Sequence, residues 1–335
     1  MTGAPLVSVV ISTFNRAGAL KQTLEALAGQ DLGSGRYEVI VVDDGSTDDT
    51  SSVLAAMDTP YALHSVRHER NRGVSAGRNS AIRVARGRHL VMISDDVLVD
   101  SSFLRRHVET LEQLPRSWVV GSFEQLDDLT AFPFGRYLDG LEQGFEEGRK
   151  AGEIGPGLWE MTWPTARNLS LPRSDLDRIG LFDERFHTTC EDQDLAQRAR
   201  EIGIRFVYSE HIRCIHNDQA SDLARYCNFQ QRGARDGPLL FAKHPEVYAG
   251  SALAKENGPI ARSDGALLAA KKRLKLVASS RPARSALQRT LRAAERLNAP
   301  QPVLNLGYRA AIGLAIFRGW REGLRQGEIQ APADT

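Results

Sequence analysis

Short runs of apolar, β-branched residues alternate with amphipathic stretches along the first hundred residues of the chain. The runs that are typical of strands are Val7–Thr13, Tyr37–Asp43, Tyr61–Val66 and His89–Ser94. Apolar residues at helical spacing between these runs predict helices over Ala17–Ala28 and Asp49–Met57. Strands that alternate with helices form βαβ units, so the pattern predicts an α/β fold with a mostly parallel, Rossmann-like sheet flanked by helices.

Polar residues directly follow three of the predicted strands. The three clusters are Thr13-Phe14-Asn15-Arg16, Asp43-Asp44-Gly45-Ser46 and Ser94-Asp95-Asp96. In open parallel sheets a ligand binds beyond the carboxyl ends of the strands. We therefore expect the three clusters to meet at one edge of the sheet and to form a binding site there.

Two adjacent carboxylates, Asp43 and Asp44, end the second strand and need an explanation beyond local structure. The segment from Gly45 to Asp48 suits a turn followed by a helix cap. One capping residue is sufficient, however, and adjacent like charges repel each other. An EF-hand loop needs alternating ligands with a final Glu, and a dinucleotide site needs Gly-x-Gly-x-x-Gly after the first strand. The sequence has neither pattern at these positions.

The composition limits the class of protein. The 335 residues are 41% hydrophobic and 25% charged, which suits one or two domains with a buried core. The longest apolar run, Ala310–Phe317, is too short to span a membrane, and no basic residue precedes the run Leu6–Ile11 as a signal peptide requires. The spacing of Cys190, Cys214 and Cys227 suits neither a disulfide framework nor a zinc site. We therefore expect reduced thiols and a cytoplasmic protein.

Charge is unevenly distributed although the net charge is only +1. Between Arg262 and Arg296 there are 10 Lys or Arg and 2 Asp or Glu, so this segment carries +8 and the rest carries −7. An acidic main domain disfavours nucleic acid as a partner, and no aromatic residues lie among the basic ones as a base-stacking surface requires.

Five segments occur in an order that resembles the family 2 glycosyltransferases. They are Ser8–Arg16, Val41–Asp48, Asn71–Asn79, Ile93–Asp100 and Glu191–Arg198, and two further segments that lead to the last one are Asn168–Ser174 and Ile179–Phe186. The resemblance implies a GT-A fold. It also implies inverting transfer of a sugar from a nucleotide-sugar donor to a hydroxyl of a glycan or lipid-linked acceptor.

The resemblance also assigns donor-binding residues. It implies that Asp44, with Asp43 as the alternative, accepts a hydrogen bond from the nucleobase. Ser12 or Thr13 would contact the base or the ribose. The planar guanidinium of Arg78 would close the base pocket. Asn15 and Arg16 belong to the same donor-binding set, and a solvent-facing helix position is the alternative for Arg78.

Departure of a nucleoside diphosphate requires a cation at the phosphates, and carboxylates are suitable ligands for Mg²⁺ or Mn²⁺. By the resemblance, Asp96 is the metal ligand, Asp95 contacts the ribose or donor sugar, and His216 meets the metal or diphosphate. Ser94 stands where many family members have the first Asp of Asp-x-Asp. Capping roles for the two carboxylates and a structural role for His216 are the alternatives.

The reaction also needs a base that accepts the proton of the acceptor hydroxyl. The resemblance implies Asp192, with Glu191 beside it, at the start of a helix whose N-terminus stabilises negative charge. A plain acidic first turn is the alternative. A different class of function, a non-catalytic nucleotide-sugar-binding or scaffold protein on the same fold, remains open because of Ser94.

The C-terminal part carries no specific chemistry. Residues 1–100 are expected to form the nucleotide-sugar-binding half, 101–245 the acceptor-binding and catalytic half, and 246–335 a basic helical extension. The segment Gly265–Leu297 predicts a basic amphipathic helix with Leu287, Leu291, Ala294 and Leu297 on one stripe. This helix either packs on the domain, which its short stripe favours, or makes a peripheral contact with an anionic membrane or a lipid-diphosphate acceptor.

Overall fold

The structure is a computed structural model that describes residues 3–217, 222–248 and 250–326. Two compact units make up the chain. The first comprises Met1–Asp127, Asp139–His187 and Glu191–Gln219, and the second comprises Asp128–Leu138, Thr188–Cys190 and Ala220–Thr335. The division of the chain into three parts at residues 100 and 245 stays a prediction.

A mixed sheet forms the centre of the first unit, with the strand order β3-β2-β1-β4-β9-β6-β10-β8-β7. The parallel half consists of β1 (Val7–Thr13), β2 (Tyr37–Asp43), β3 (Ala62–Arg67) and β4 (His89–Ile93). The other half consists of β9 (Asn168–Pro172), β6 (Ser117–Gln125), β10 (Arg205–His216), β8 (Leu158–Met161) and β7 (Lys150–Gly155). Strand β9 is antiparallel to β4 and to β6, and a short strand, β5 (Val97–Val99), pairs with the end of β10.

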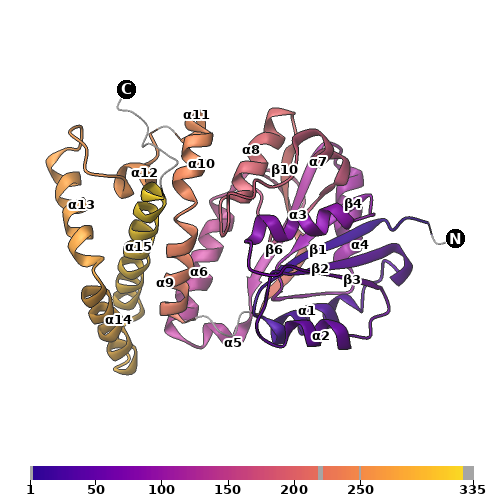
Figure 1. Cartoon of the computed structure of the whole chain (residues 1–335), viewed down its shortest axis with the longest axis horizontal. Helices are drawn as coiled ribbons and strands as arrows, with labels where there is room; N and C mark the ends of the chain where they lie inside the picture. The colour runs from indigo at the N-terminus through magenta and orange to yellow at the C-terminus, as the bar shows by residue number, and fades with distance from the viewer. Residues whose placement is uncertain (1–2, 218–221, 249, 327–335) are drawn as a thin grey trace. The chain divides into compact units, whose positions relative to one another are not determined.

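Strands β1, β2 and β4 are buried on both faces, as their continuous apolar runs predict, whereas the edge strand β3 is largely exposed. Val9 packs into one apolar cluster with helices α1 (Ala17–Leu27) and α4 (Phe103–Gln113). The next residue, Val10, faces the other cluster, which contains residues of α3 (Val74–Val84), α7 (Arg173–Ile179) and α8 (Glu191–Glu201). Figure 1 shows helices on both faces of the sheet. The predicted α/β fold is therefore confirmed.

For the strands and helices expected in the first hundred residues, the predicted boundaries agree with the structure to within one residue. Strands β1 and β2 have the predicted bounds, β3 begins and ends one residue later than predicted, and β4 ends one residue earlier. Helix α2 spans Thr50–Ala56, and the Asp48 side chain before it accepts from the Thr50 backbone N–H at 3.1 Å, which forms a turn that leads into the helix.

The second unit is helical. Its helices are α9 (Leu223–Gly233), α10 (Gly237–Lys243), α11 (Pro245–Tyr248), α12 (Ala252–Asn257), α13 (Ala266–Ala278), α14 (Arg281–Arg296) and α15 (Gln301–Arg325). Their core is an apolar cluster built around Leu291, Leu304 and Tyr308. Phe134 and Tyr137 join this cluster from the start of α6 (Pro133–Glu147), which follows the short helix α5 (Asp127–Thr130).

The single basic helix expected over Gly265–Leu297 is in fact two helices, and this expectation was wrong. The chain leaves the helical conformation between Ala278 and Arg281, and Pro282 occupies the first turn of α14. Backbone N–H groups in the first turn of a helix have no partner within the helix, so proline, which lacks an N–H, fits there. In the middle of a continuous helix a proline would break the helix.

The predicted apolar stripe is present on α14. Leu287, Leu291 and Ala294 pack into the cluster of the second unit, but Leu297 follows the helix and is 81% exposed. Among the residues that the structure describes, no helix has the length and apolar character needed to cross a membrane.

Candidate active site

The carboxyl ends of β1, β2 and β4 meet at one edge of the sheet, as the sequence predicts. The Asp44 backbone N–H donates to the Thr13 carbonyl at 2.9 Å. The Thr13 hydroxyl donates to Asp95 Oδ2 at 2.6 Å, which joins the ends of β1 and β4. Asp43, Asp44, Asp95 and Asp96 are all buried. Four carboxylates therefore lie along this edge with little access to solvent.

Asp43 organises the turn that follows β2. Its carboxylate accepts hydrogen bonds from the backbone and hydroxyl of Ser46, from the Ser51 hydroxyl at 2.8 Å, and from Arg67 Nη1 at 3.0 Å. Burial raises the pKa of Asp43, but these contacts outweigh it and hold the pKa below its ordinary value. Gly45 has φ 79° and a Cβ there would lie 2.6 Å from the Arg70 carbonyl carbon, so the turn requires glycine.

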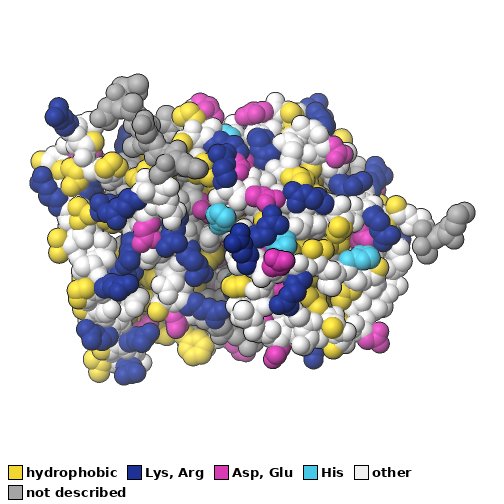
Figure 2. All heavy atoms as spheres, in the orientation of Figure 1, with side chains coloured by type: hydrophobic (Ala, Val, Ile, Leu, Met, Phe, Trp, Pro, Cys, Tyr) yellow, Lys and Arg dark blue, Asp and Glu magenta, His cyan; other side chains and the backbone are white. Residues whose placement is uncertain are grey.

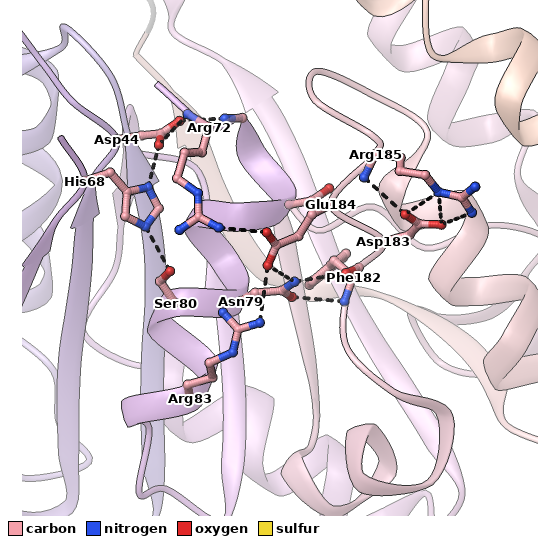
Figure 3. Close-up of polar contacts among 12 residues, drawn as sticks. Asp44, His68, Arg72, Asn79, Ser80, Arg83, Phe182, Asp183, Glu184 and Arg185 are labelled. Carbon is pink, nitrogen blue, oxygen red and sulfur yellow. Dashed lines mark hydrogen bonds and ion pairs between the residues drawn. The ribbon is translucent and has the colours of Figure 1, made fainter. Parts of the chain in front are cut away.

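Asp44 holds the segment that leads into α3 (Figure 3). Its Oδ1 atom accepts from the Arg72 backbone N–H at 2.9 Å and lies 2.6 Å from His68 Nδ1, while Oδ2 accepts from the Gly73 N–H at 2.8 Å. His68 Nε2 lies 2.9 Å from the Ser80 hydroxyl on α3. No role for His68 was expected from the sequence, because no motif marks a lone histidine.

Asn79, the residue after Arg78, connects α3 to the segment before α8. Its side-chain amide exchanges two hydrogen bonds with the Phe182 backbone, at 2.9 and 3.0 Å. Glu184 accepts from Asn79 at 3.0 Å, from Arg72 at 2.9 Å and from Arg83 at 3.2 Å, as Figure 3 shows. Both segments resembled family motifs, but only the structure shows that they hold each other.

Arg78, Glu191 and Asp192 form a second group. Arg78 Nη1 donates to Glu191 Oε1 at 2.5 Å, and Glu191 is only 5% exposed. Burial, together with the charge of Asp192, raises the pKa of Glu191 to about 7. Asp192 is partly buried and accepts from the Gln193 backbone N–H at 2.9 Å. Burial raises the pKa of Asp192 too, and the charge of Arg78 offsets part of that increase.

Asp96 and His216 form a third group with Arg16. The Asp96 Oδ2 atom accepts from the Arg16 guanidinium and lies 3.1 Å from His216 Nε2. Burial raises the pKa of Asp96, but the His216 hydrogen bond and the charges of His216 and Arg16 outweigh it and keep the pKa below its ordinary value. Burial and the Asp96 charge raise the pKa of Asp95 to about 7.

This third group fits a divalent cation. A hard carboxylate oxygen and an imidazole nitrogen converge there. The Arg16 guanidinium contacts the same oxygen and would have to move from it for a cation to bind. Within the described residues, no group of three or more His, Cys, Asp or Glu side chains is placed to hold a metal ion. Asp96 and His216 would thus supply two ligands, and the remaining ligands would come from the donor and from water.

Arg167, which precedes β9, links the second and third groups and was missed by the sequence analysis. Its carbonyl accepts from the Ser94 backbone N–H at 3.1 Å. Its guanidinium lies 4.0 Å from the centre of the Phe123 ring, and that ring lies 4.8 Å from the His216 ring. Burial raises the pKa of Asp192, and the charge of Arg167, after that of Arg78, offsets part of this increase. No motif marks Arg167, so only its position in space indicates a role.

Ser12 and Asn15 also lie at this edge of the sheet, and both make contacts that hold neighbouring segments together. The Ser12 hydroxyl packs so closely on α3 that a Cβ at Gly77 would lie 2.1 Å from it. Asn15 has φ 56°, its N–H donates to the Ser46 hydroxyl at 2.9 Å, and its side-chain oxygen accepts from the Thr47 N–H at 2.8 Å. Asn15 therefore joins the turns after β1 and β2, and its contact with a donor stays a prediction.

Known proteins share both the sequence pattern and the fold. The family model described as glycosyl transferase family 2 matches residues 8–180, which is just over half of the chain. The chain belongs to this family. The resemblance inferred from its motifs is confirmed.

This family 2 glycosyltransferase has relatives in several bacteria. It is 29% identical over 257 residues to an uncharacterized glycosyltransferase, YfnE, of Bacillus subtilis, a match that covers 64% of this chain and 65% of YfnE. It is 29% identical over 229 residues to the validoxylamine A glucosyltransferase of Streptomyces hygroscopicus, covering 61% of this chain and 54% of that protein. The matches therefore span less than two thirds of the length of these relatives.

The fold is similar to that of solved structures. The mannosyltransferase PcManGT from Pyrobaculum calidifontis, solved in complex with GDP-Man and Mn²⁺, matches with a TM-score of 0.61. The match covers 95% of this chain and 88% of that protein at 20% sequence identity. At this identity the likeness shows the fold, which is the predicted GT-A type.

Proposed function

We propose that this protein is an inverting glycosyltransferase that moves a sugar from a nucleotide-sugar donor to a hydroxyl of a glycan or lipid-linked acceptor. The observation that carries the proposal is that the Asp96–His216 pair and the Asp192 carboxylate both lie near Arg167, whose guanidinium stacks on the Phe123 ring beside His216 and whose charge acts on Asp192. Such an arrangement suits a reaction that needs a cation at the leaving group and a base at the acceptor.

Recognition of the donor base is assigned to Asp44. A carboxylate has about four positions for accepting hydrogen bonds. Asp43 accepts from Ser46 and Ser51, and the Arg67 guanidinium already pairs with its charge. Among the described residues Asp44 has three contacts, with His68, Arg72 and Gly73, so one position remains for an imide N–H. The ion pair of Asp43 with Arg67 favours Asp44 over Asp43.

The remaining donor contacts are assigned from the resemblance to the family. Ser12 and Thr13 at the end of β1 would contact the base or ribose, with Asn15 beside them. Asp95 would contact the ribose or donor sugar, and Arg78 would form one wall of the base pocket. Arg16 lies at Asp96, which suits a second role in contacting the diphosphate once Asp96 holds a metal ion.

Asp96 and His216 would hold Mg²⁺ or Mn²⁺. The bound ion supplies positive charge to the diphosphate, where negative charge grows as the leaving group departs. PcManGT, which is similar in fold, was solved with GDP-Man and Mn²⁺.

Asp192 is assigned as the base. The acceptor hydroxyl oxygen bonds to the anomeric carbon, and the proton of that hydroxyl passes to the Asp192 carboxylate. The bond from that carbon to the diphosphate breaks, and its electron pair stays on the diphosphate oxygen. A raised pKa suits a base that works near neutral pH. Glu191 is less suitable, because it is buried and held by Arg78.

The second candidate function is a non-catalytic nucleotide-sugar-binding or scaffold protein, which the presence of Ser94 favours. The test is a panel of UDP-, GDP- and dTDP-sugars, with glycan and lipid-linked acceptors, each with and without Mn²⁺. We expect transfer, or slow donor hydrolysis, that depends on the metal. Donor binding without turnover on any substrate would support the second function, and no binding would contradict both.

A further inference from the structure

Helix α13 in the second unit presents three aliphatic side chains to solvent, while Leu268 and Leu276 are half-buried. Leu267 is 86% exposed, Leu274 69% and Val277 72%. Lys272 is the buried residue of this helix at 3% exposure, and its Nζ atom donates to Asp264 Oδ2 and to the Pro259 carbonyl, both at 2.7 Å. A surface helix normally shows the opposite pattern, with apolar residues inward and lysines outward.

The three exposed aliphatic residues share one face of α13. At about 100° per residue, Leu267, Leu274 and Val277 lie within about 80° of one another on the helix surface. The exposed basic residues Lys271 and Arg273 lie on the two flanks of that face. An apolar face with basic flanks is typical of helices that lie in a membrane interface.

The opposite side of α13 is fixed by specific polar contacts. Lys275 donates to Asn257 Oδ1 at 3.1 Å and lies 5.5 Å from the centre of the Phe317 ring. Together with the Lys272 contacts, these interactions set the rotation of the helix. Because Lys272 and Lys275 are held on the inner side, Leu267 and Leu274 point outward.

The neighbouring helix α14 adds unpaired positive charge. Arg281, Arg289, Arg292 and Arg296 are exposed, and none forms an ion pair with the residues that the structure describes. The segment from Arg262 to Arg296 carries +8. Figure 2 shows basic and apolar side chains intermixed over the C-terminal helices, at the left of the view.

We propose that the outward face of α13, with the basic residues beside it, binds the surface of an anionic lipid bilayer. Charge complementarity decides the partner. A second copy of the chain would bring the same exposed basic side chains, such as Arg273 and Arg281, to this face and would be repelled. Anionic headgroups attract these side chains instead, and the acyl boundary accepts the three aliphatic side chains. The proposal goes beyond the proposed function and does not depend on it, because lipid binding requires neither donor nor acceptor.

The test is sedimentation of the full-length chain with vesicles of phosphatidylcholine alone or with 30% phosphatidylglycerol. We expect binding to the anionic vesicles only, weakened as salt is raised from low to near-molar concentration. The triple variant Leu267→Ser, Leu274→Ser, Val277→Ser should reduce the partition coefficient at least tenfold. These side chains are exposed, so its thermal unfolding should match that of the wild type.

Two comparisons separate the apolar and charged contributions. Ile154→Ser, a matched change of an exposed aliphatic residue on β7, should leave vesicle binding unchanged. Arg281→Gln with Arg292→Gln should weaken binding to anionic vesicles and reduce its salt dependence. The proposal is overturned if the full-length chain does not sediment with anionic vesicles or if the triple variant binds as well as the wild type. It is also overturned if light scattering shows a dimer that the triple variant dissociates.

Discussion

Arg78 and Glu191 are 113 residues apart in the chain, yet Arg78 Nη1 lies 2.5 Å from Glu191 Oε1. The ion pair joins α3, whose start is held by Asp44, to the first residue of α8, which precedes Asp192. Only Oε1 of the buried Glu191 carboxylate has a described partner, since Oε2 has none among the described residues. The proposed donor-binding side and the proposed base therefore lie on elements joined by this ion pair.

The pKa of Glu191 should make stability depend on pH. Burial raises this pKa from 4.5 to about 7, so the folded chain keeps a proton that the unfolded chain releases between those values. Stability should therefore fall as pH rises through this window and stay lower above it. Glu191→Gln should reduce that fall by up to about 3 kcal/mol, measured by urea unfolding from pH 4.5 to 8. Equal pH profiles for variant and wild type would contradict the assignment.

Asp192→Asn should lower sugar transfer by roughly 10²-fold or more while changing donor affinity only a few-fold, because a base acts in the transition state and hardly in donor binding. Steady-state transfer and nucleotide titration measure the two effects. Glu201→Gln, at the exposed last residue of the same helix, is the matched control and should change neither. Normal turnover in Asp192→Asn would move the role of base to another residue.

Asp96→Ala should weaken metal-dependent donor binding far more than Ser94→Ala, because only Asp96 offers a charged ligand. Calorimetric titration of UDP, with and without Mn²⁺, checks this. His216→Ala should give an intermediate loss if the imidazole is the second ligand. If Ser94→Ala and Asp96→Ala have equal effects, the metal site has been placed wrongly.

His68→Ala should destabilise the fold by about 1–3 kcal/mol, because it leaves buried acceptor positions on Asp44 without a donor. It should also weaken nucleotide binding several-fold, since Asp44 would lose its orientation. Ser80→Ala removes only the outer contact of His68 and should cost about 0.5–1.5 kcal/mol. Chemical unfolding and nucleotide titration of both variants distinguish these results, and unchanged binding in His68→Ala would argue against an orienting role.

A chain that ends after Ala261 should unfold at a lower temperature. It lacks α13 to α15 and with them Tyr308, whose ring lies 5.1 Å from Phe134 and 5.3 Å from Tyr137. Each buried aromatic or aliphatic side chain that becomes exposed costs about 1.5–3 kcal/mol. Differential scanning calorimetry against a chain that ends after Gln326, which keeps α15 whole, measures the loss. An unchanged transition would mean that these helices add no stability.

Local pattern was sufficient to predict the parallel half of the sheet. Strands buried on both faces need continuous apolar runs, so Val7–Thr13 and Tyr37–Asp43 were located correctly from the sequence. Their polar ends met at one edge because parallel strands that are adjacent in the sheet end on the same side. The order of motifs then identified the family, since it needs no knowledge of distances.

Tertiary structure alone decided which side chains meet. His68 contacts Asp44 across 24 residues, and His216 reaches Asp96 across 120, separations that no local pattern records. The direction of α13 was also undetermined, because the spacing of Leu267, Leu274 and Val277 is the same whether that face is buried or exposed. The contacts of Lys272 with Asp264 and Pro259 turned the lysine inward and the leucines outward. The spacing of apolar residues shows that they share one face of a helix, but the packing of the helix decides whether that face is buried or exposed.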